Sequence, residues 1–150
     1  MALINNVNII STIFGRTLFV QSISDTSRKI LNMIENIFGC NYNNIELDNV
    51  FIETDIEATL KTLDTLVLEI KGNDKQLSNT ISTAFNNLNN IILEIEQLIC
   101  TINKILQKHD QRYFYFLFSV NINKELIQLR IKSIILDKRL ELLIKMVQII

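Results

Sequence analysis

The 150-residue sequence contains no proline and no tryptophan, and it has only three glycines, two cysteines and one histidine. The three glycines, Gly15, Gly39 and Gly72, stand far apart. They therefore cannot form the clustered backbone amides of a P-loop or a dinucleotide-binding turn. His109 is the only histidine, so a catalytic triad or an imidazole metal site would have no second imidazole to draw on. We expect no cofactor-binding, metal-binding or catalytic residues, and we predict that the protein is not an enzyme.

Signals for disulfides, export and membrane insertion are also missing. Cys40 and Cys100 are too few for a disulfide framework and are predicted to be free thiols. No basic residue precedes Arg16, and three asparagines interrupt the first apolar stretch, so a secretory signal is not expected. No apolar run approaches the roughly 18 residues of a spanning helix. We expect a soluble, intracellular protein.

Charge and composition limit the classes of partner that we expect. The net charge is −1, so there is no overall positive field of the kind that drives nucleic-acid binding. Isoleucine and asparagine are abundant, and both are encoded by A/T-rich codons, which favours a low-GC genome such as that of a large DNA virus. In that case the protein would lie in the host cytoplasm or the virion. The high isoleucine and leucine content excludes a disordered chain.

The spacing of the apolar residues predicts an all-α protein with four to five helices in a bundle. The length fits one helical domain over residues 1–150, with N-terminal helices and a loop in 1–50 and a long-helix core in 51–150. Residues 74–150 are expected to form a long antiparallel hairpin, because two long amphipathic patterns are joined there by a short break.

In the first half of the chain the pattern predicts three helices and a loop. A helix over 1–21 is followed by one that Asp25 caps and that runs to Phe38. Residues 40–50 are rich in asparagine and aspartate and are predicted to be a loop, with a short extended segment over Ile45–Ile52. A third helix begins at Thr54, which has capping-box spacing to Glu57, and it ends at Gly72. The apolar stripes of the first and third helices are Leu3, Val7, Ile10, Phe14 and Leu18, and Ile56, Leu60, Leu63, Val67 and Ile70.

The second half carries the most regular pattern, a 4-3 repeat of apolar residues in two long helices. The first is predicted over 74–108 and the second over 121–150, with a turn from His109 to Val120. A second apolar row along the first helix makes its face wide enough for a bundle. The main stripes are Leu77, Ile81, Ala84, Leu88, Ile91, Ile95, Leu98, Ile102 and Ile105, and Ile122, Leu126, Leu129, Ser133, Leu136, Leu140, Leu143, Val147 and Ile150; the second row is Phe85, Ile92, Ile99 and Leu106.

The final helix carries more apolar residues than one stripe can use. Ile127, Ile131, Ile134 and Ile135 lie off its main stripe. A helix that is apolar on several faces is normally buried on more than one side. This helix is therefore either the centre of the bundle or a contact with another subunit.

Charge is divided between two segments of the chain. Residues 46–69 are acidic, whereas residues 104–150 are basic and include Arg130, Lys132 and Arg139. Either the acidic and basic helices pack beside one another in one molecule, or the basic helix faces an acidic partner, a membrane surface or nucleic acid. The neighbouring carboxylates Glu94 and Glu96 are expected on opposite flanks of their helix, so they cannot bind one ion.

Five aromatic residues are concentrated in the predicted turn: Tyr113, Phe114, Tyr115, Phe116 and Phe118. They either cap one end of the core or form an exposed anchor for a partner or a lipid headgroup layer.

We therefore predict a non-enzymatic structural or assembly protein that acts through protein–protein contacts and self-associates. One alternative is a groove-type regulator that binds an amphipathic helix in the style of Bcl-2 proteins, and another is a bundle that binds the membrane surface. The predicted partner-binding residues are Ile127, Ile131, Ile134, Ile135, Tyr113, Phe114, Phe116, Arg130, Lys132 and Arg139.

Overall fold

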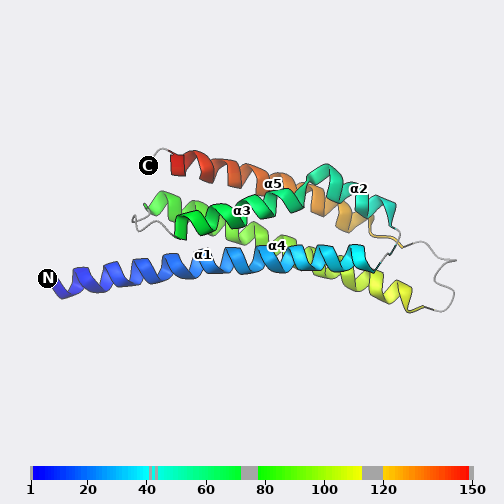
Figure 1. Cartoon of the computed structure of the whole chain (residues 1–150), viewed down its shortest axis with the longest axis horizontal. Coiled ribbons are helices and arrows are strands. Elements are labelled where there is room, and N and C mark those ends of the chain that lie inside the picture. The colour runs from blue at the N-terminus through cyan, green and yellow to red at the C-terminus, as the bar shows by residue number, and fades with distance from the viewer. Residues whose placement is uncertain (1, 41, 43, 72–77, 113–119, 149–150) are drawn as a thin grey trace.

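A computed structural model shows an all-α protein, which confirms the predicted fold class (Figure 1). It describes the backbone of residues 2–40, 42, 44–71, 78–112 and 120–148, and the side chains of these residues from Val20 onward except Lys71. Five helices lie within these ranges: α1 (Ala2–Gly39), α2 (Ile45–Thr54), α3 (Ile56–Lys71), α4 (Asn79–Asp110) and α5 (Asn123–Gln148).

The helices form a four-sided bundle in which α2 and α3 together make one side (Figure 1). Helix α4 packs between α1 and α5, and α3 packs against α1. Helices α2 and α3 both border α5, with α2 making the closer contact. The predicted hairpin of the two long C-terminal helices is present as α4 and α5. Because α3 and α4 each lie between α1 and α5, these two consecutive helices occupy diagonal corners of the bundle.

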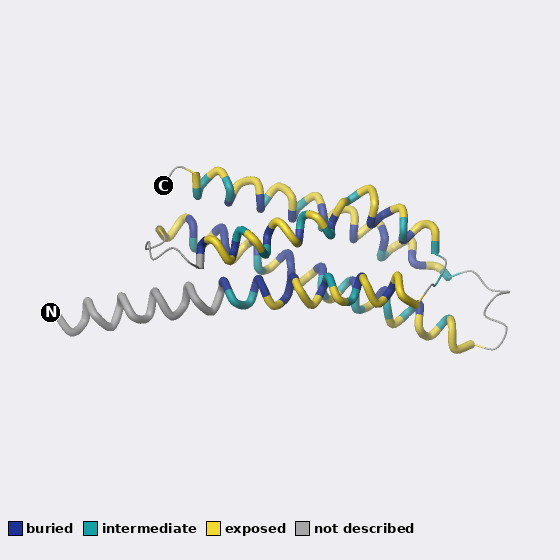
Figure 2. Tube along the Cα trace, in the orientation of Figure 1, coloured by how far each residue is buried: buried dark blue, intermediate teal, exposed yellow. Residues whose placement is uncertain are grey.

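The predicted apolar stripes form the core. The whole stripe of α3 is buried, and the buried face of each helix points toward the bundle axis in Figure 2. The second row of α4, from Phe85 to Leu106, is buried as well, because α4 contacts two neighbours. Leu98, Ile105 and Val147 are only partly buried at the edge of the core. Leu77 and Ile150, and the side chains from Leu3 to Leu18, lie outside the described residues.

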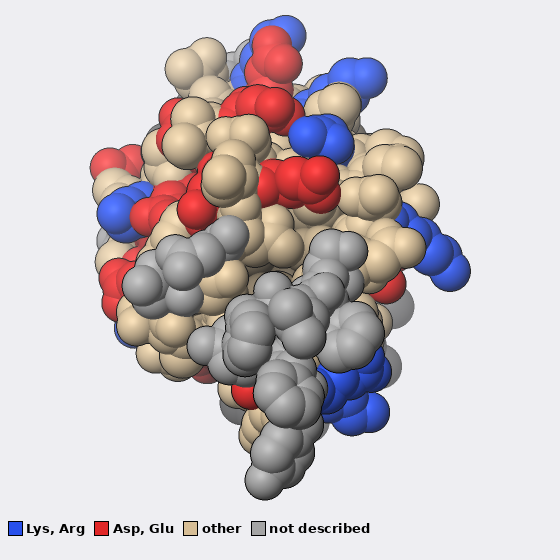
Figure 3. All heavy atoms as spheres, turned by 90° about the vertical axis from the view of Figure 1, so that its right-hand side faces the viewer, with Lys and Arg blue, Asp and Glu red and all other residues tan. Residues whose placement is uncertain are grey.

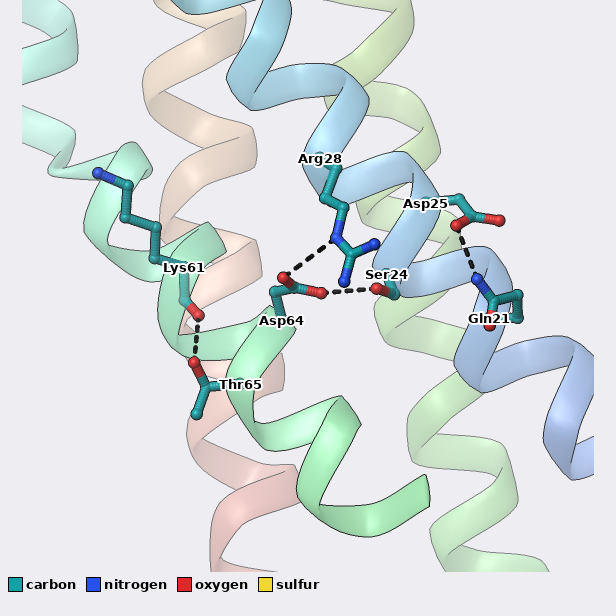
Figure 4. A network of polar contacts seen from close by, with 7 residues as sticks. All are labelled: Gln21, Ser24, Asp25, Arg28, Lys61, Asp64 and Thr65. Atoms are coloured by element: carbon teal, nitrogen blue, oxygen red, sulfur yellow. Dashed lines mark hydrogen bonds and ion pairs between the residues drawn. The ribbon is translucent and has the colours of Figure 1, made fainter. Parts of the chain in front are cut away.

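The predicted break before Asp25 is wrong, because α1 is one continuous helix of 38 residues. The polar residues that suggested a cap are instead used inside the helix (Figure 4). Asp25 accepts a hydrogen bond of 2.8 Å from Gln21 one turn earlier, and Ser24 donates one of 2.6 Å to Asp64 of α3. Both side chains have partners in the folded bundle, Asp25 on α1 itself and Ser24 on α3, so neither is needed to cap a helix.

The loop predicted over 40–50 is wrong from residue 45 onward, and the extended segment predicted over Ile45–Ile52 is wrong, because helix α2 begins at Ile45. Asn44 caps it by accepting a hydrogen bond of 3.0 Å from the backbone N–H of Leu47. Leu47, Val50 and Phe51 then lie at helical spacing on the buried face. The pattern was overlooked because asparagine and aspartate suit both loops and helix starts.

The capping box predicted at Thr54 is not formed. Thr54 ends α2, and its hydroxyl donates to the carbonyl of Val50 in α2 instead of accepting from a backbone N–H of the next helix. The chain then turns at Asp55, whose φ of 47° and ψ of 37° lie in the left-handed region. A single residue in this conformation separates α2 from α3 and lets both pack on the same side of the bundle.

Helix α4 begins at Asn79, where Ser78 caps it by accepting from the backbone N–H of Ile81. The predicted start at residue 74 lies outside the described residues. Helix α4 ends at Asp110 and α5 begins at Asn123, each two residues later than the predicted helix boundaries at 108 and 121. None of the described helices is long and apolar enough to cross a membrane.

Ion pairs confirm that Glu94 and Glu96 occupy opposite flanks of α4. Glu94 accepts from Lys132 of α5 at 2.8 Å, whereas Glu96 pairs with Lys29 of α1. The hydrogen bond to Glu96 and its negative charge raise the pKa of Lys29 above the ordinary value. The two carboxylates therefore tie α4 to both of its neighbours.

Candidate interaction surface

The outward face of α5 carries a row of exposed isoleucines. Helix α5 buries its main stripe, and Ile127, Ile131 and Ile134 lie on the opposite side at 53%, 45% and 54% exposure. Ile135 is half-buried and packs against the core. Three of the four off-stripe isoleucines are thus left in contact with solvent by the protomer.

Two lysines bracket this row at helical spacing. Lys124 precedes Ile127 by three residues, and Lys138 follows Ile134 by four. Both are exposed, and neither has an ion-pair partner among the residues that the structure describes. We call Lys124, Ile127, Ile131, Ile134 and Lys138 the α5 stripe.

The three basic residues that the sequence suggested for a partner all have partners in their own chain. Arg130 pairs with Glu53 of α2 at 3.1 Å, and Lys132 pairs with Glu94 of α4. Arg139 donates a hydrogen bond of 2.6 Å to the backbone carbonyl of Asn87. One of these contacts, between Arg130 and Glu53, joins the basic segment to the acidic segment within one molecule, and the other two tie α5 to α4.

The aromatic residues predicted to bind a partner, Tyr113, Phe114 and Phe116, lie outside the described residues. Their role remains a prediction.

A second apolar feature, which the sequence interpretation missed, lies on α2. Ile45 and Ile52 are 73% and 76% exposed, on the side of α2 away from Leu47 and Val50. Asp48 lies between them at spacings of three and four residues. We call Ile45, Asp48 and Ile52 the α2 stripe. It could have been found by treating Asn44 as a helix cap. Residues spaced by three and four positions after a cap, as Ile45, Asp48 and Ile52 are, lie on one face of the helix.

A groove of about 500 Å³ runs between α3 and α5. Its apolar wall comes from Ala58, Leu140 and Ile144, and its polar edge includes Asp55, Thr59, Thr62, Asp137, Glu141, Lys145 and Gln148. The hydroxyl of Thr59 and the carboxylate of Asp137 lie 3.2 Å apart across it. Its walls come from segments far apart in the sequence, so no local pattern could have predicted it.

Charge is distributed unevenly at the end of the bundle that includes α2. Figure 3 looks onto this end, where acidic side chains gather over the middle and left, and most lysines and arginines lie around the edges. Helix α2 contributes Glu46, Asp48 and Glu53 and has no basic residue. This end therefore presents carboxylates close to the exposed isoleucines of α2.

Within the described ranges no group of three or more His, Cys, Asp or Glu side chains is placed to hold a metal ion. Cys40 and Cys100 are free thiols, as predicted. Comparison of the chain with protein-family models, curated proteins and solved structures finds no match.

Proposed function

We propose that the protein is a non-enzymatic assembly subunit that acts through protein–protein contacts and associates with copies of itself. The observation that carries this proposal is the α5 stripe, in which three isoleucines in a row are each about half exposed. The free energy decreases when a partner removes contiguous apolar side chains from water. The composition fits a soluble, intracellular subunit encoded by a low-GC genome such as that of a large DNA virus.

The exposed isoleucines are not needed to close the core. The opposite face of α5 supplies buried leucines at 129, 136 and 143, and each is fully enclosed by the neighbouring helices. An apolar residue that a fold leaves outside can usually be replaced by a polar one at little cost in stability. The isoleucines are thus available for a role in binding.

Light scattering coupled to size-exclusion chromatography tests this proposal over roughly 1–100 µM protein. We expect a mass above the 17.4 kDa of one chain, rising with concentration. Ile131→Lys should reduce the mass to that of a monomer. Leu68→Lys on α3 is the matched control, because Leu68 is similarly exposed, at 48%, but lies outside both stripes. A wild-type monomer at every concentration would refute self-association.

The groove between α3 and α5 supports a second candidate, a regulator that binds an amphipathic helix. Its apolar wall and its edge carboxylates, Asp55, Asp137 and Glu141, suit a helix with one apolar and one basic face. A synthetic Leu/Lys amphipathic peptide, titrated into labelled protein and followed by NMR, is the test. Shifts at Ala58, Leu140 and Ile144 would support the groove, whereas their absence at millimolar peptide would exclude it.

A further inference from the structure

The two helices that form the groove, α3 and α5, run parallel to one another (Figure 1). Thr59 of α3 contacts Asp137 of α5, and Glu53, which precedes α3, pairs with Arg130, which precedes Asp137. Positions later in one segment therefore lie beside positions later in the other. The groove thus has an α2 end, where α3 begins, and a C-terminal end, where α3 and α5 both stop.

The unpaired negative charge of the groove is concentrated at its α2 end. Asp55 and Asp137 lie there, and neither has an ion-pair partner among the residues that the structure describes. Asp137 only accepts a hydrogen bond of 3.2 Å from the neutral hydroxyl of Thr59. Farther along, Glu141 pairs with Lys145 at 3.2 Å, so these two charges balance one another. The two ends of the groove therefore differ in charge.

The helix dipoles give the groove the same polarity. Helices α3 and α5 end at Lys71 and Gln148, so the partial negative charges of their C-termini lie toward the C-terminal end of the groove. A bound helix that runs antiparallel to both places its positive N-terminus at this end. Its own C-terminus then lies beside Asp55 and Asp137. Basic residues near that C-terminus are favoured by the dipole of the bound helix and by the two carboxylates.

The shape and chemistry of the groove favour one face of an amphipathic helix as its occupant. Ala58, Leu140 and Ile144 supply an apolar wall, and a volume of about 500 Å³ leaves room for apolar side chains while the opposite face of the bound helix stays in water. An acidic helix or an anionic lipid surface would bring negative charge toward Asp55 and Asp137. A basic helix is therefore the occupant that the charges select.

We propose that the groove binds an amphipathic helix of a partner protein antiparallel to α3 and α5, with the basic residues of that helix in its C-terminal half. This inference rests on the groove as the second candidate function described above. It adds the direction of the bound helix and the position of its charges.

Two synthetic peptides of identical composition test this inference on the full-length chain. Each carries leucines at helical spacing, and its lysines lie only in the C-terminal half or, in the reversed sequence, only in the N-terminal half. In NMR titrations of labelled protein, the first peptide should bind roughly fivefold more tightly. Equal affinities of the two peptides would overturn the inference.

A variant of the protein separates the charges of the groove from the helicity of the free peptides, which also depends on where the lysines lie. In the double variant Asp55→Asn, Asp137→Asn the preference for the first peptide should shrink. Asparagine tolerates the left-handed conformation at position 55 and retains an acceptor for Thr59 at position 137. Asp48→Asn on α2, outside the groove, is the matched control and should keep the full preference. A preference that is unchanged in the double variant would contradict the role of the two carboxylates.

A nitroxide label at the N-terminus of the first peptide tests the direction. It should broaden the amide signals of Ile144 and Gln148 more than those of Ala58 and Thr59, and the opposite order would overturn the antiparallel arrangement. Binding to the groove in the wrong direction leaves the second candidate function standing without this inference. If neither peptide shifts the signals of the apolar wall, the groove is not a helix-binding site, and both fail.

Discussion

The hydroxyl of Ser24 donates a hydrogen bond of 2.6 Å to the carboxylate of Asp64, which joins α1 to α3 across 40 residues of sequence. Arg28 reaches the other carboxylate oxygen at 3.4 Å, so Asp64 lies between two side chains of α1 (Figure 4). Asp64 is mostly buried, whereas Arg28 is more than half exposed. The serine bond is therefore the stronger of the two contacts, because solvent screens the exposed ion pair.

We expect Asp64→Ala to lower the free energy of unfolding by about 1–2 kcal/mol, because it removes the acceptor for Ser24 and the ion pair with Arg28. Urea denaturation followed by circular dichroism measures the change. Arg28→Ala is the control and should cost under about 1 kcal/mol. Equal losses for the two variants would show that the ion pair, and not the serine bond, joins these helices.

Ser27 offers the opposite case, because its hydroxyl is buried and has no hydrogen-bond partner among the residues that the structure describes. A buried hydroxyl that has given up water without replacing it destabilises the folded state. Ser27→Ala should therefore raise the free energy of unfolding by about 1 kcal/mol. The urea midpoint should increase with no change in slope. A loss of stability would mean that the hydroxyl has a partner, such as an ordered water molecule.

The left-handed conformation of Asp55 predicts how this position responds to substitution. A residue with a β-carbon is strained at φ 47°, and glycine is not. We expect Asp55→Gly to keep or raise the thermal midpoint, and Asp55→Val to lower stability by about 1–2 kcal/mol, because a β-branched side chain disfavours this region further. Calorimetry of the two variants measures the difference. Equal stabilities would argue against the left-handed turn.

The raised pKa of Lys29 predicts a loss of stability at alkaline pH. The hydrogen bond and the charge of Glu96 favour the protonated lysine in the folded state, so this contribution is complete below the unfolded pKa of about 10.5 and is lost as pH rises through the higher folded pKa. Thermal unfolding between pH 9 and 12 should show a steeper decline for wild type than for Lys29→Met.

Comparison with Lys29→Met is needed because burial also raises the pKa of Tyr42, which adds a decline in the same direction to both proteins. Parallel pH profiles for wild type and Lys29→Met would exclude the contribution of Lys29.

The sequence predicted the parts of the fold that repeat. The stripe from Ile81 to Ile102 needed only helical periodicity, because apolar residues at these positions have no other arrangement that buries them together. The errors fell where polar residues have two uses. Asp25 suggested a helix cap, but it accepts a hydrogen bond from Gln21 inside a continuous helix. Asn44 suggested a loop, but it caps a helix by accepting from the backbone N–H of Leu47.

The candidate surface was predictable in part. The surplus of isoleucines on α5 was visible from the sequence, but their exposure depends on the position of α5 in the bundle, which the sequence left open between the centre and an outer side. Ile45 and Ile52 were missed with the helix that carries them. The partners of Arg130, Lys132 and Arg139 depend on which helices become neighbours, and helical periodicity does not contain that information.

The diagonal placement of α3 and α4 has a consequence for the order of folding. An antiparallel pair such as α4 and α5 requires only a short loop to close, so it can form early. Helix α1, by contrast, packs against α3 and α4, whose centres lie some 40 and 70 residues later in the sequence. In a refolding experiment that quenches hydrogen exchange at successive times, the amides of α4 and α5 should gain protection first. The amides of α1 should gain protection last, when this helix packs between α3 and α4.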